Sequence, residues 1–233
     1  MLGISGGSGN GAFGMELGRK IIHTFALFYL VIYFAFDYLT GPGTGLLVLA
    51  GMLVAVIIIE YIRLERRAGI PLLSWLWANF RRENEQERPG AELFFLLGVI
   101  VALGVFELRV AVAAVLMTVF GDLTAALAGI RWGRVRPRVL HGKSIEGSLA
   151  ALLINLAAGW VFLRDSGAGA AWWQPLLAGG AFPGFGLPLW PVIAVMSAVA
   201  AVTELIITKI DDNLTIPVFA GFAGQLALSA FCR

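Results

Sequence analysis

Chemically reactive side chains gather in one segment of the sequence, residues 121–148, which reads GDLTAALAGIRWGRVRPRVLHGKSIEGS. The segment begins with a single acid, Asp122, in a run of small and apolar residues typical of a membrane helix. A carboxylate inside an apolar span is costly to bury and usually has a function. Its natural partner is Mg²⁺, a hard cation that binds one or two carboxylates together with phosphate oxygens. Asp122 is therefore predicted to bind a metal ion.

The same segment ends in a short sequence that is suited to binding phosphate. Lys143 follows Gly142, and two hydroxyl residues, Ser144 and Ser148, come soon after it. Glycine lets the backbone approach a phosphate closely, and lysine brings a positive charge to it. Ser144 is expected to cap a helix that begins at the next residue, so that the N-terminus of that helix would also face the phosphate.

Two features of this segment each keep two interpretations. Glu146 is either a metal ligand or an acid in the first turn of a helix, where the helix dipole favours negative charge. The arginines between the two ends of the segment anchor the loop on the positively charged side of the membrane. Among these arginines, Arg134 is also a candidate for neutralising phosphate oxygens.

A second group of acids follows near the end of the chain. Glu204 lies within an apolar span, AVMSAVAAVTELIIT, close to the end that leads into the short polar loop Lys209-Ile-Asp-Asp-Asn213. At about 1.5 Å of rise per residue, Glu204 and Asp212 reach the same membrane face. We expect Asp122, Glu204 and Asp212 to share a metal site, with Asp211 as a solvated neighbour.

A third, weaker group lies near the N-terminus. Glu16, Arg19, Lys20 and His23 share one side of a helix, because they are spaced at i, i+3, i+4 and i+7. The group is either an anchor at the membrane surface or a further part of the site.

The composition is that of an integral membrane protein. Of the 233 residues, 59% are hydrophobic and 14% are charged, whereas soluble domains carry about 25% charged residues. Apolar runs long enough to cross a bilayer recur along the chain. We predict an all-α, polytopic helical bundle of about seven transmembrane helices, at 21–39, 46–63, 91–106, 110–128, 145–163, 188–208 and 214–231.

The distribution of lysine and arginine predicts the orientation of this bundle. If the N-terminus is cytoplasmic, fourteen of the 17 basic residues fall in cytoplasmic segments, and only Arg109, Arg164 and Arg233 fall outside. We therefore expect a flexible tail at 1–14 and one catalytic domain at 15–233, with cytoplasmic loops at 64–90, 129–146 and 209–213. Within the first loop, 70–80 is apolar and aromatic but too short to span, which indicates an interfacial helix.

Small residues recur every four positions through the fourth predicted span and just beyond it, at Gly121, Ala125, Gly129 and Gly133. Such a ridge lets two membrane helices approach closely. The polar residues singled out above would then lie at the cytoplasmic ends of closely packed helices.

Taken together, these motifs resemble the CTP-dependent lipid kinases: dolichol kinase, phytol kinase and the CTP-dependent diacylglycerol kinase. The central signature of that family is similar to Asp122, Ala125, Gly129 and Gly133, followed after eight residues by a Lys-Lys-Thr-x-Glu-Gly-like segment, which is Gly142–Gly147 in this chain. Gly142 replaces the first lysine, and Ser144 replaces the threonine but keeps its hydroxyl. Arg19-Lys20-x-x-His23, Glu204 and Asp212-Asn213-x-x-Ile216-Pro217 also look like this family.

The resemblance implies an enzyme that transfers the γ-phosphoryl group of CTP to a membrane lipid alcohol, with Mg²⁺ as cofactor. The alcohol would be a polyprenol such as dolichol, phytol or diacylglycerol. Catalysis would rest on Asp122, Lys143, Glu146 and Asp212, and the metal would be held by Asp122, Glu204 and Asp212. Nucleotide binding would involve Gly129, Gly133, Arg134, Lys143, Ser144, Gly147, Ser148 and Asn213, and Arg19, Lys20 and His23 are further candidates.

Two other functions stay open at this stage. Phosphatidate cytidylyltransferases share a related core, but their C-terminal Pro-Gly-His-Gly-Gly-x-x-Asp-Arg pattern is replaced by Asp212-Asn213-Leu-Thr-Ile-Pro217. A transporter would place acids at mid-membrane in both halves of the chain, whereas these acids cluster at cytoplasmic helix ends. We expect CTP, the lipid alcohol and the bilayer as partners, no nucleic acid, and a prokaryotic plasma membrane with the site on its cytoplasmic face. The oligomeric state is not indicated.

Overall fold

The computed structural model describes residues 27–66, 89–137, 142–163, 190–207 and 211–231. Seven α-helices and no strands occur in these ranges. They are α2 (Phe28–Thr40), α3 (Thr44–Arg66), α5 (Ala91–Val105), α6 (Leu108–Trp132), α7 (Ile145–Leu163), α9 (Trp190–Ile206) and α10 (Asp212–Phe231). These helices coincide with the predicted spans to within a few residues at most ends, so the helical membrane fold is confirmed.

By length and hydropathy, four of the described helices can cross a membrane: α3, α6, α7 and α10. The other three described helices, α2, α5 and α9, are apolar but shorter than 18 residues. The chain is thus an integral membrane protein, while the total of seven spans and the cytoplasmic N-terminus stay predictions.

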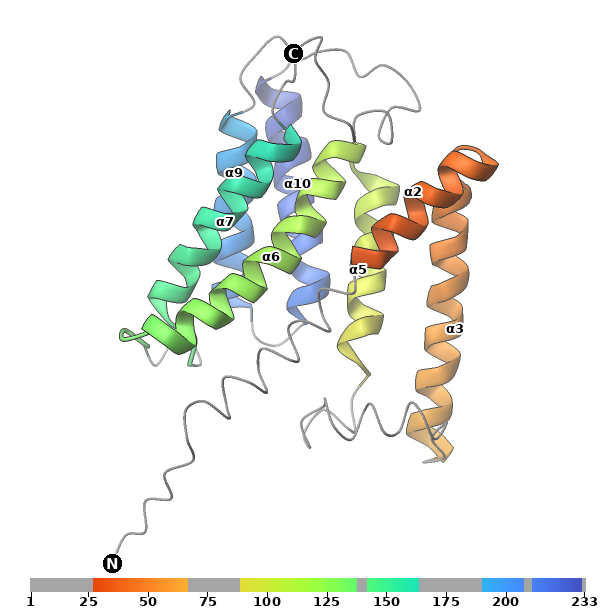
Figure 1. The fold of residues 1–233 in the computed structure, drawn as a ribbon, viewed down its shortest axis with the longest axis horizontal. Coiled ribbons are helices and arrows are strands. Elements are labelled where there is room, and N and C mark those ends of the chain that lie inside the picture. The colour runs from red at the N-terminus through yellow and green to blue at the C-terminus, as the bar shows by residue number, and fades with distance from the viewer. Residues whose placement is uncertain (1–26, 67–88, 138–141, 164–189, 208–210, 232–233) are drawn as a thin grey trace, which may run out of the picture.

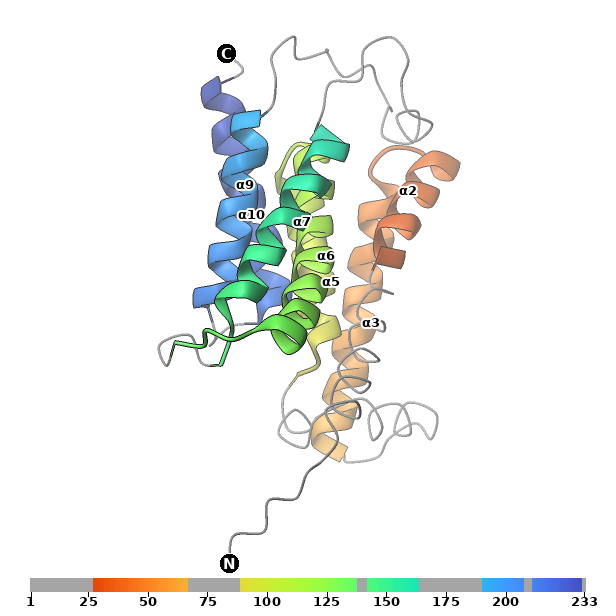
Figure 2. The same ribbon diagram turned by 60° about the vertical axis from the view of Figure 1, so that its left-hand side comes forward.

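The helices run up and down in alternation, and α6 lies at the centre of the bundle (Figures 1 and 2). Fourteen residues of α6 are buried, more than in α5, α7, α9 or α10. Its most extensive packing is against α7, and α10 packs against α9, α6 and α5. The α2–α3 hairpin makes its main contacts outside itself with α5.

The corner between α5 and α6 shows how local sequence directs this packing. Glu107 caps α6, because its side-chain Oε2 accepts hydrogen bonds from the backbone N–H groups of Arg109 and Val110 at 3.0 and 3.2 Å. The backbone N–H of Glu107 donates to Oε1 of Gln225 in α10 at 2.8 Å. Glu107 therefore both caps the start of α6 and attaches the α5–α6 corner to α10.

The predicted ridge of small residues is confirmed as the contact between α6 and α7. A Cβ added to Gly147 would lie 2.6 Å from the carbonyl oxygen of Ala125, and one added to Gly129 would lie 2.9 Å from Ser144 Oγ. Real side chains do not pack at such distances, so only glycine fits at these two positions. Close approach brings the polar end of α7 directly against α6.

Several predictions concern residues outside the described ranges. The tail at 1–14, the group Arg19, Lys20 and His23, and the interfacial helix at 70–80 all lie there. Lys209, in the predicted loop at 209–213, lies there as well. The predictions for these residues stay untested.

Candidate active site

The polar helix ends expected on one membrane face do lie at one end of the bundle. The end of α6, the start of α7, the end of α9 and the start of α10 meet there, opposite the α5–α6 corner (Figure 1). The residues singled out at 121–148 and at 204–213 are thereby brought together across about sixty residues of sequence.

Lys143 makes the central contacts of this end. Its ammonium nitrogen lies 2.9 Å from Oδ2 of Asp212 and 3.3 Å from Oε1 of Glu204, and it also donates to the carbonyl oxygen of Glu204. Burial alone lowers the pKa of the Lys143 ammonium, but the two neighbouring carboxylates raise it above the ordinary value. Lys143 is therefore positively charged near neutral pH and joins α9 and α10 to the start of α7.

The backbone before α7 explains how Lys143 reaches this position. Gly142 has a φ of +90°, which only glycine adopts without strain. Ser144 then begins the helix as predicted, since its Oγ accepts a hydrogen bond from the backbone N–H of Gly147 at 3.1 Å. Ser144 is buried against Gly129 and Gly133, because a Cβ on either glycine would come within 2.9 Å of its hydroxyl oxygen.

Glu146 holds the basic loop in place in this structure. Its Oε1 accepts hydrogen bonds from the backbone N–H groups of Arg134 and Val135, both at 3.0 Å. The loop is further fixed by Arg136, whose guanidinium donates to the carbonyl oxygen of Gly129 at 2.7 Å. Of the two interpretations of Glu146, the arrangement favours an acid near the helix N-terminus, and Arg134 keeps an exposed side chain that is available to phosphate.

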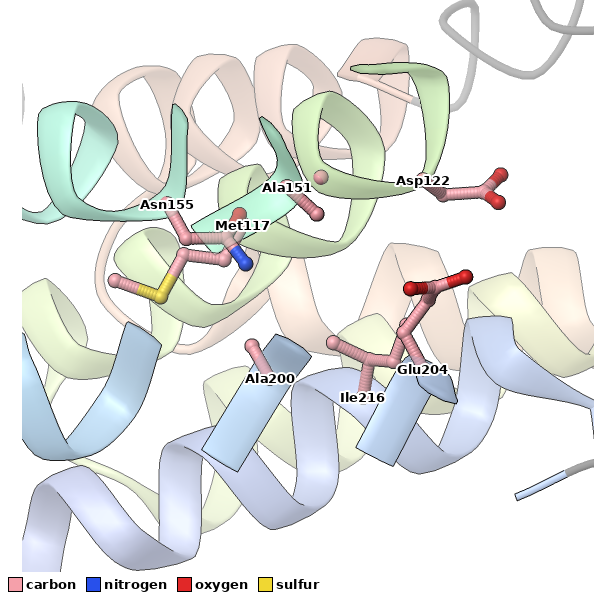
Figure 3. A pocket seen from close by; sticks show the side chains of 8 residues that line it. Met117, Asp122, Ala151, Asn155, Ala200, Glu204 and Ile216 are labelled. Carbon is pink, nitrogen blue, oxygen red and sulfur yellow. The ribbon is translucent and has the colours of Figure 1, made fainter. Parts of the chain in front are cut away.

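Asp122 and Glu204 line a narrow pocket between α6, α7, α9 and α10. Their carboxylates extend into the same gap from two helices (Figure 3). The negative charges of Asp122 and Glu204 also act on Asp212, so both acids lie close enough to Asp212 to repel its carboxylate. The predicted trio is thus brought together, with Lys143 as a positive charge beside two of its members.

These residues suit a hard divalent cation. Carboxylate oxygens are the ligands that Mg²⁺ prefers, and Oδ1 of Asp212 is buried without a hydrogen-bond partner. Within the described ranges, however, no three acidic, histidine or cysteine side chains already converge as a ligand set. Lys143 supplies the neutralising charge in this state, and the metal site stays a prediction.

Two of the remaining candidates have structural roles in this conformation. Asn213 is buried, and the contact of its carbonyl oxygen with Gly98 holds α10 against α5. The hydroxyl of Ser148 donates to the carbonyl oxygen of Ser144 at 3.3 Å, within its own helix. Gly129, Gly133 and Gly147 surround Ser144, as described above.

The structure adds two polar residues that the sequence argument did not select. Asn155 in α7 and Ser197 in α9 are 2% and 0% exposed, and Asn155 lines the same pocket as Asp122. The signal was present, because an amide in the middle of an apolar span is as unusual as an acid. Neither residue carries a charge or lies in a motif, so charge and motif spacing do not single it out.

The chain is similar over most of its length to three curated proteins. It is 27% identical over 213 residues to the CTP-dependent diacylglycerol kinase 1 of Schizosaccharomyces pombe, covering 87% of this chain and 89% of that protein. It is 27% identical over 214 residues to the protein of the same name from Eremothecium gossypii, covering 88% and 65%. For the protein of the same name from Saccharomyces cerevisiae, the identity is 25% over 229 residues, covering 93% and 74%.

No protein-family model matches the chain, and no solved structure matches it. The three similarities confirm the predicted relationship to the CTP-dependent lipid kinases. They also confirm the predicted class of enzyme, a phosphotransferase with an alcohol acceptor.

Proposed function

We propose that this chain phosphorylates diacylglycerol, using CTP as phosphoryl donor, at the polar end of the α6, α7, α9 and α10 bundle. The observation that carries the proposal is the meeting of Lys143, at the glycine-flanked start of α7, with acids from α6, α9 and α10. The similarity to CTP-dependent diacylglycerol kinases supports this donor and this acceptor above a polyprenol or phytol.

The chemistry needs positioning and charge stabilisation more than covalent catalysis. The oxygen of the lipid hydroxyl attacks the γ-phosphorus of CTP, the bond from that phosphorus to the β–γ bridging oxygen breaks, and CDP leaves. The proton of the hydroxyl passes to a carboxylate of the site, for which Asp122 and Asp212 are the candidates. Bound Mg²⁺, held by Asp122, Glu204 and Asp212, would neutralise charge on the phosphates.

The positive side of the site comes from the loop and the start of α7. Lys143 is within reach of the acids and would exchange its contact with them for phosphate oxygens when the nucleotide enters. The N-terminus of α7 adds its partial positive charge, and Arg134 is exposed beside it. We place this end on the cytoplasmic face, where CTP is available.

A labelling experiment with purified protein tests the reaction. CTP labelled at the γ-phosphate is expected to leave its label in lipid, and CTP labelled at the α-phosphate is expected to leave it in CDP. A cytidylyltransferase would instead put the α-label into lipid and the γ-label into pyrophosphate. Absence of nucleotide binding would favour a transporter.

Asp122→Asn tests the site in the same assay. The variant keeps the shape of the side chain but loses its charge, so we expect at least a hundredfold loss of phosphorylated lipid from protein that still inserts in the membrane. Glu65→Gln, in α3 and distant from the pocket, is the matched control and should keep activity. Full activity of Asp122→Asn would contradict the assignment.

A further inference from the structure

The four helices that carry the candidate site pack as two pairs. α6 packs most extensively against α7, and α10 packs most extensively against α9. The pocket between Asp122 and Glu204 lies on the boundary between these pairs, because five of its lining residues belong to α6 and α7 and three belong to α9 and α10. The residues that the proposed reaction needs are therefore divided between the two pairs.

The two pairs interlock at the end of the bundle that is remote from the acids. A Cβ added to Gly159 of α7 would lie 2.8 Å from Cγ2 of Ile193 in α9. A Cβ added to Gly224 of α10 would lie 2.9 Å from Cγ1 of Val110 in α6. Each of these contacts joins one pair to the other through close apolar packing, which resists deformation. This end of the boundary is therefore suited to act as a pivot.

At the polar end, the same boundary contains buried polar atoms that are not satisfied. Among the described residues, Oδ1 of Asn155 in α7, Oγ of Ser197 in α9 and Oδ1 of Asp212 in α10 are buried without a hydrogen-bond partner. By its helical spacing, Ser197 lies on the same side of α9 as Ile193 and Glu204. As formed by the described helices, the gap has no room for a single water molecule. Unsatisfied buried atoms cost free energy, so the closed boundary is less stable at this end.

Lys143 holds the two pairs together at the polar end. It directly precedes α7 and contacts Glu204 in α9 and Asp212 in α10, so its side chain crosses from one pair to the other. The carboxylates of Asp122 in α6 and Asp212 in α10 repel each other across the same boundary. A phosphate group that draws Lys143 away from the acids would therefore replace attraction between the pairs by repulsion.

The boundary has two sides, which differ in what covers them. α5 packs against both α6 and α10 and covers one side. On the other side, α7 and α9 pack against each other at the surface of the bundle (Figure 2). Near the polar end, Leu149 of α7 and Val202 and Ile206 of α9 are exposed apolar side chains. An opening between α7 and α9 would therefore connect the pocket with the hydrocarbon of the bilayer.

We propose that the acceptor lipid reaches the site from the bilayer between α7 and α9, which separate at the polar end when Lys143 leaves the acids and turn about the glycine contacts at the other end. The inference rests on the proposed function and names the route of its lipid substrate. Because the nucleotide displaces Lys143, the lipid binds after CTP.

Distances between spin labels in lipid nanodiscs measure this opening. In a Cys232→Ser background, labels at Leu149→Cys and Ile206→Cys occupy exposed positions of α7 and α9 near the polar end. We expect the distance to lengthen when diacylglycerol is added with Mg²⁺ and a CTP analogue that has a methylene group between its β- and γ-phosphorus atoms. An inserted hydrocarbon chain is about 4 Å wide, the separation of two packed carbon atoms, so an increase of that size is expected.

Labels at Ala157→Cys and Ala194→Cys are the matched control. Both alanines are exposed, and they lie next to the pivot, since Ala157 is two residues from Gly159 and Ala194 is adjacent to Ile193. The distance between these labels should stay constant when the same ligands are added. Equal lengthening of both distances would mean that the helices separate as a whole, and it would overturn the proposed opening.

Lys143→Met tests the opening without any ligand. Loss of the ammonium group leaves the carboxylates of the two pairs to repel each other, so the free protein should already show the longer distance between positions 149 and 206. Lys143→Arg keeps the charge and should keep the shorter distance. An unchanged distance in Lys143→Met would show that the lysine does not hold the pairs together.

The outcomes separate this inference from the proposed function. If the protein phosphorylates diacylglycerol but the distance between positions 149 and 206 does not respond to the ligands, the route is wrong although the kinase stands. If no lipid accepts phosphate from CTP, the proposed function fails. The distance in Lys143→Met, which requires neither substrate, then decides by itself whether α7 and α9 separate.

Discussion

Lys143 is the residue on which the charges of the site depend. It lies between two carboxylates from different helices, and a third, Asp122, is nearby. The lysine thereby does for the acids what a divalent cation would do, namely keep their mutual repulsion small. We propose that nucleotide binding makes the lysine exchange these acids for phosphate oxygens.

Replacing Lys143 should make this relation measurable. In Lys143→Met, the acids lose their internal cation, so we expect Mn²⁺ to bind at least tenfold more tightly without nucleotide than it binds the unaltered protein. Activity should fall at least a hundredfold, because no ammonium is left for phosphate. Paramagnetic resonance of free Mn²⁺ measures the first effect.

Lys143→Arg, which keeps the charge, is the control and should bind Mn²⁺ as the unaltered protein does. An unchanged Mn²⁺ affinity in Lys143→Met would mean that the lysine does not stand in for a metal.

At the scale of elements, the contact between α6 and α7 positions Lys143 and the start of α7, where we propose that phosphate binds. Gly147 contacts the backbone of α6 at Ala125. Ser144 is enclosed by Gly129 and Gly133 at the end of α6 and by Gly147 in α7. Glu146 holds the loop that joins the helices. The loop is thus fixed from both ends before any nucleotide arrives.

Gly147→Val should separate the two helices at this point. Its added carbon atoms would meet the carbonyl oxygen of Ala125, which is backbone and cannot move aside. We expect a lower midpoint of thermal unfolding without nucleotide and at least a tenfold loss of activity. Gly51→Val is the control, because a Cβ at Gly51 in α3 meets nothing within 4 Å.

If Gly147→Val unfolds at the same temperature as the unaltered protein, the close contact of α6 and α7 is not what supports the loop.

The sequence predicted the elements better than the relations between them. Hydropathy located all seven described helices, because the mean hydropathy of a span is taken over many residues and changes little with any one of them. Asp122 and Glu204 were identifiable since a charge in an apolar span is rare. The ion pairs of Lys143 were not, because they depend on how α9 and α10 pack, and Asn155 was missed because an amide carries no charge.

At the scale of the whole molecule, the end of α6 and the start of α7 lie at one end of the bundle, and the α5–α6 corner lies at the other (Figure 1). The candidate site residues belong to the first of these ends, the polar end. We infer that the polar end is cytoplasmic, which the excess of basic residues in the connecting segments supports. This orientation decides from which side CTP enters.

Cysteine labelling in cells tests the orientation. In a Cys232→Ser background, Tyr38→Cys lies near the end of α2 and Trp132→Cys at the end of α6, and the original side chains are 77% and 65% exposed. A maleimide that does not cross membranes should label position 38 in intact cells and position 132 only after permeabilisation. Labelling of both positions from the same side would contradict the topology.

The α2–α3 hairpin stands apart from this arrangement. It packs mainly against α5, and only 17% of the most apolar 18-residue stretch of α3 is buried within the protein. The outward surface of the hairpin is therefore under little selection for catalysis, because any apolar side chain is compatible with contact to lipid. Among descendants of a common ancestor, this hairpin should accumulate substitutions fastest, and its outward residues should drift among leucine, isoleucine, valine and phenylalanine while the glycines between α6 and α7 persist.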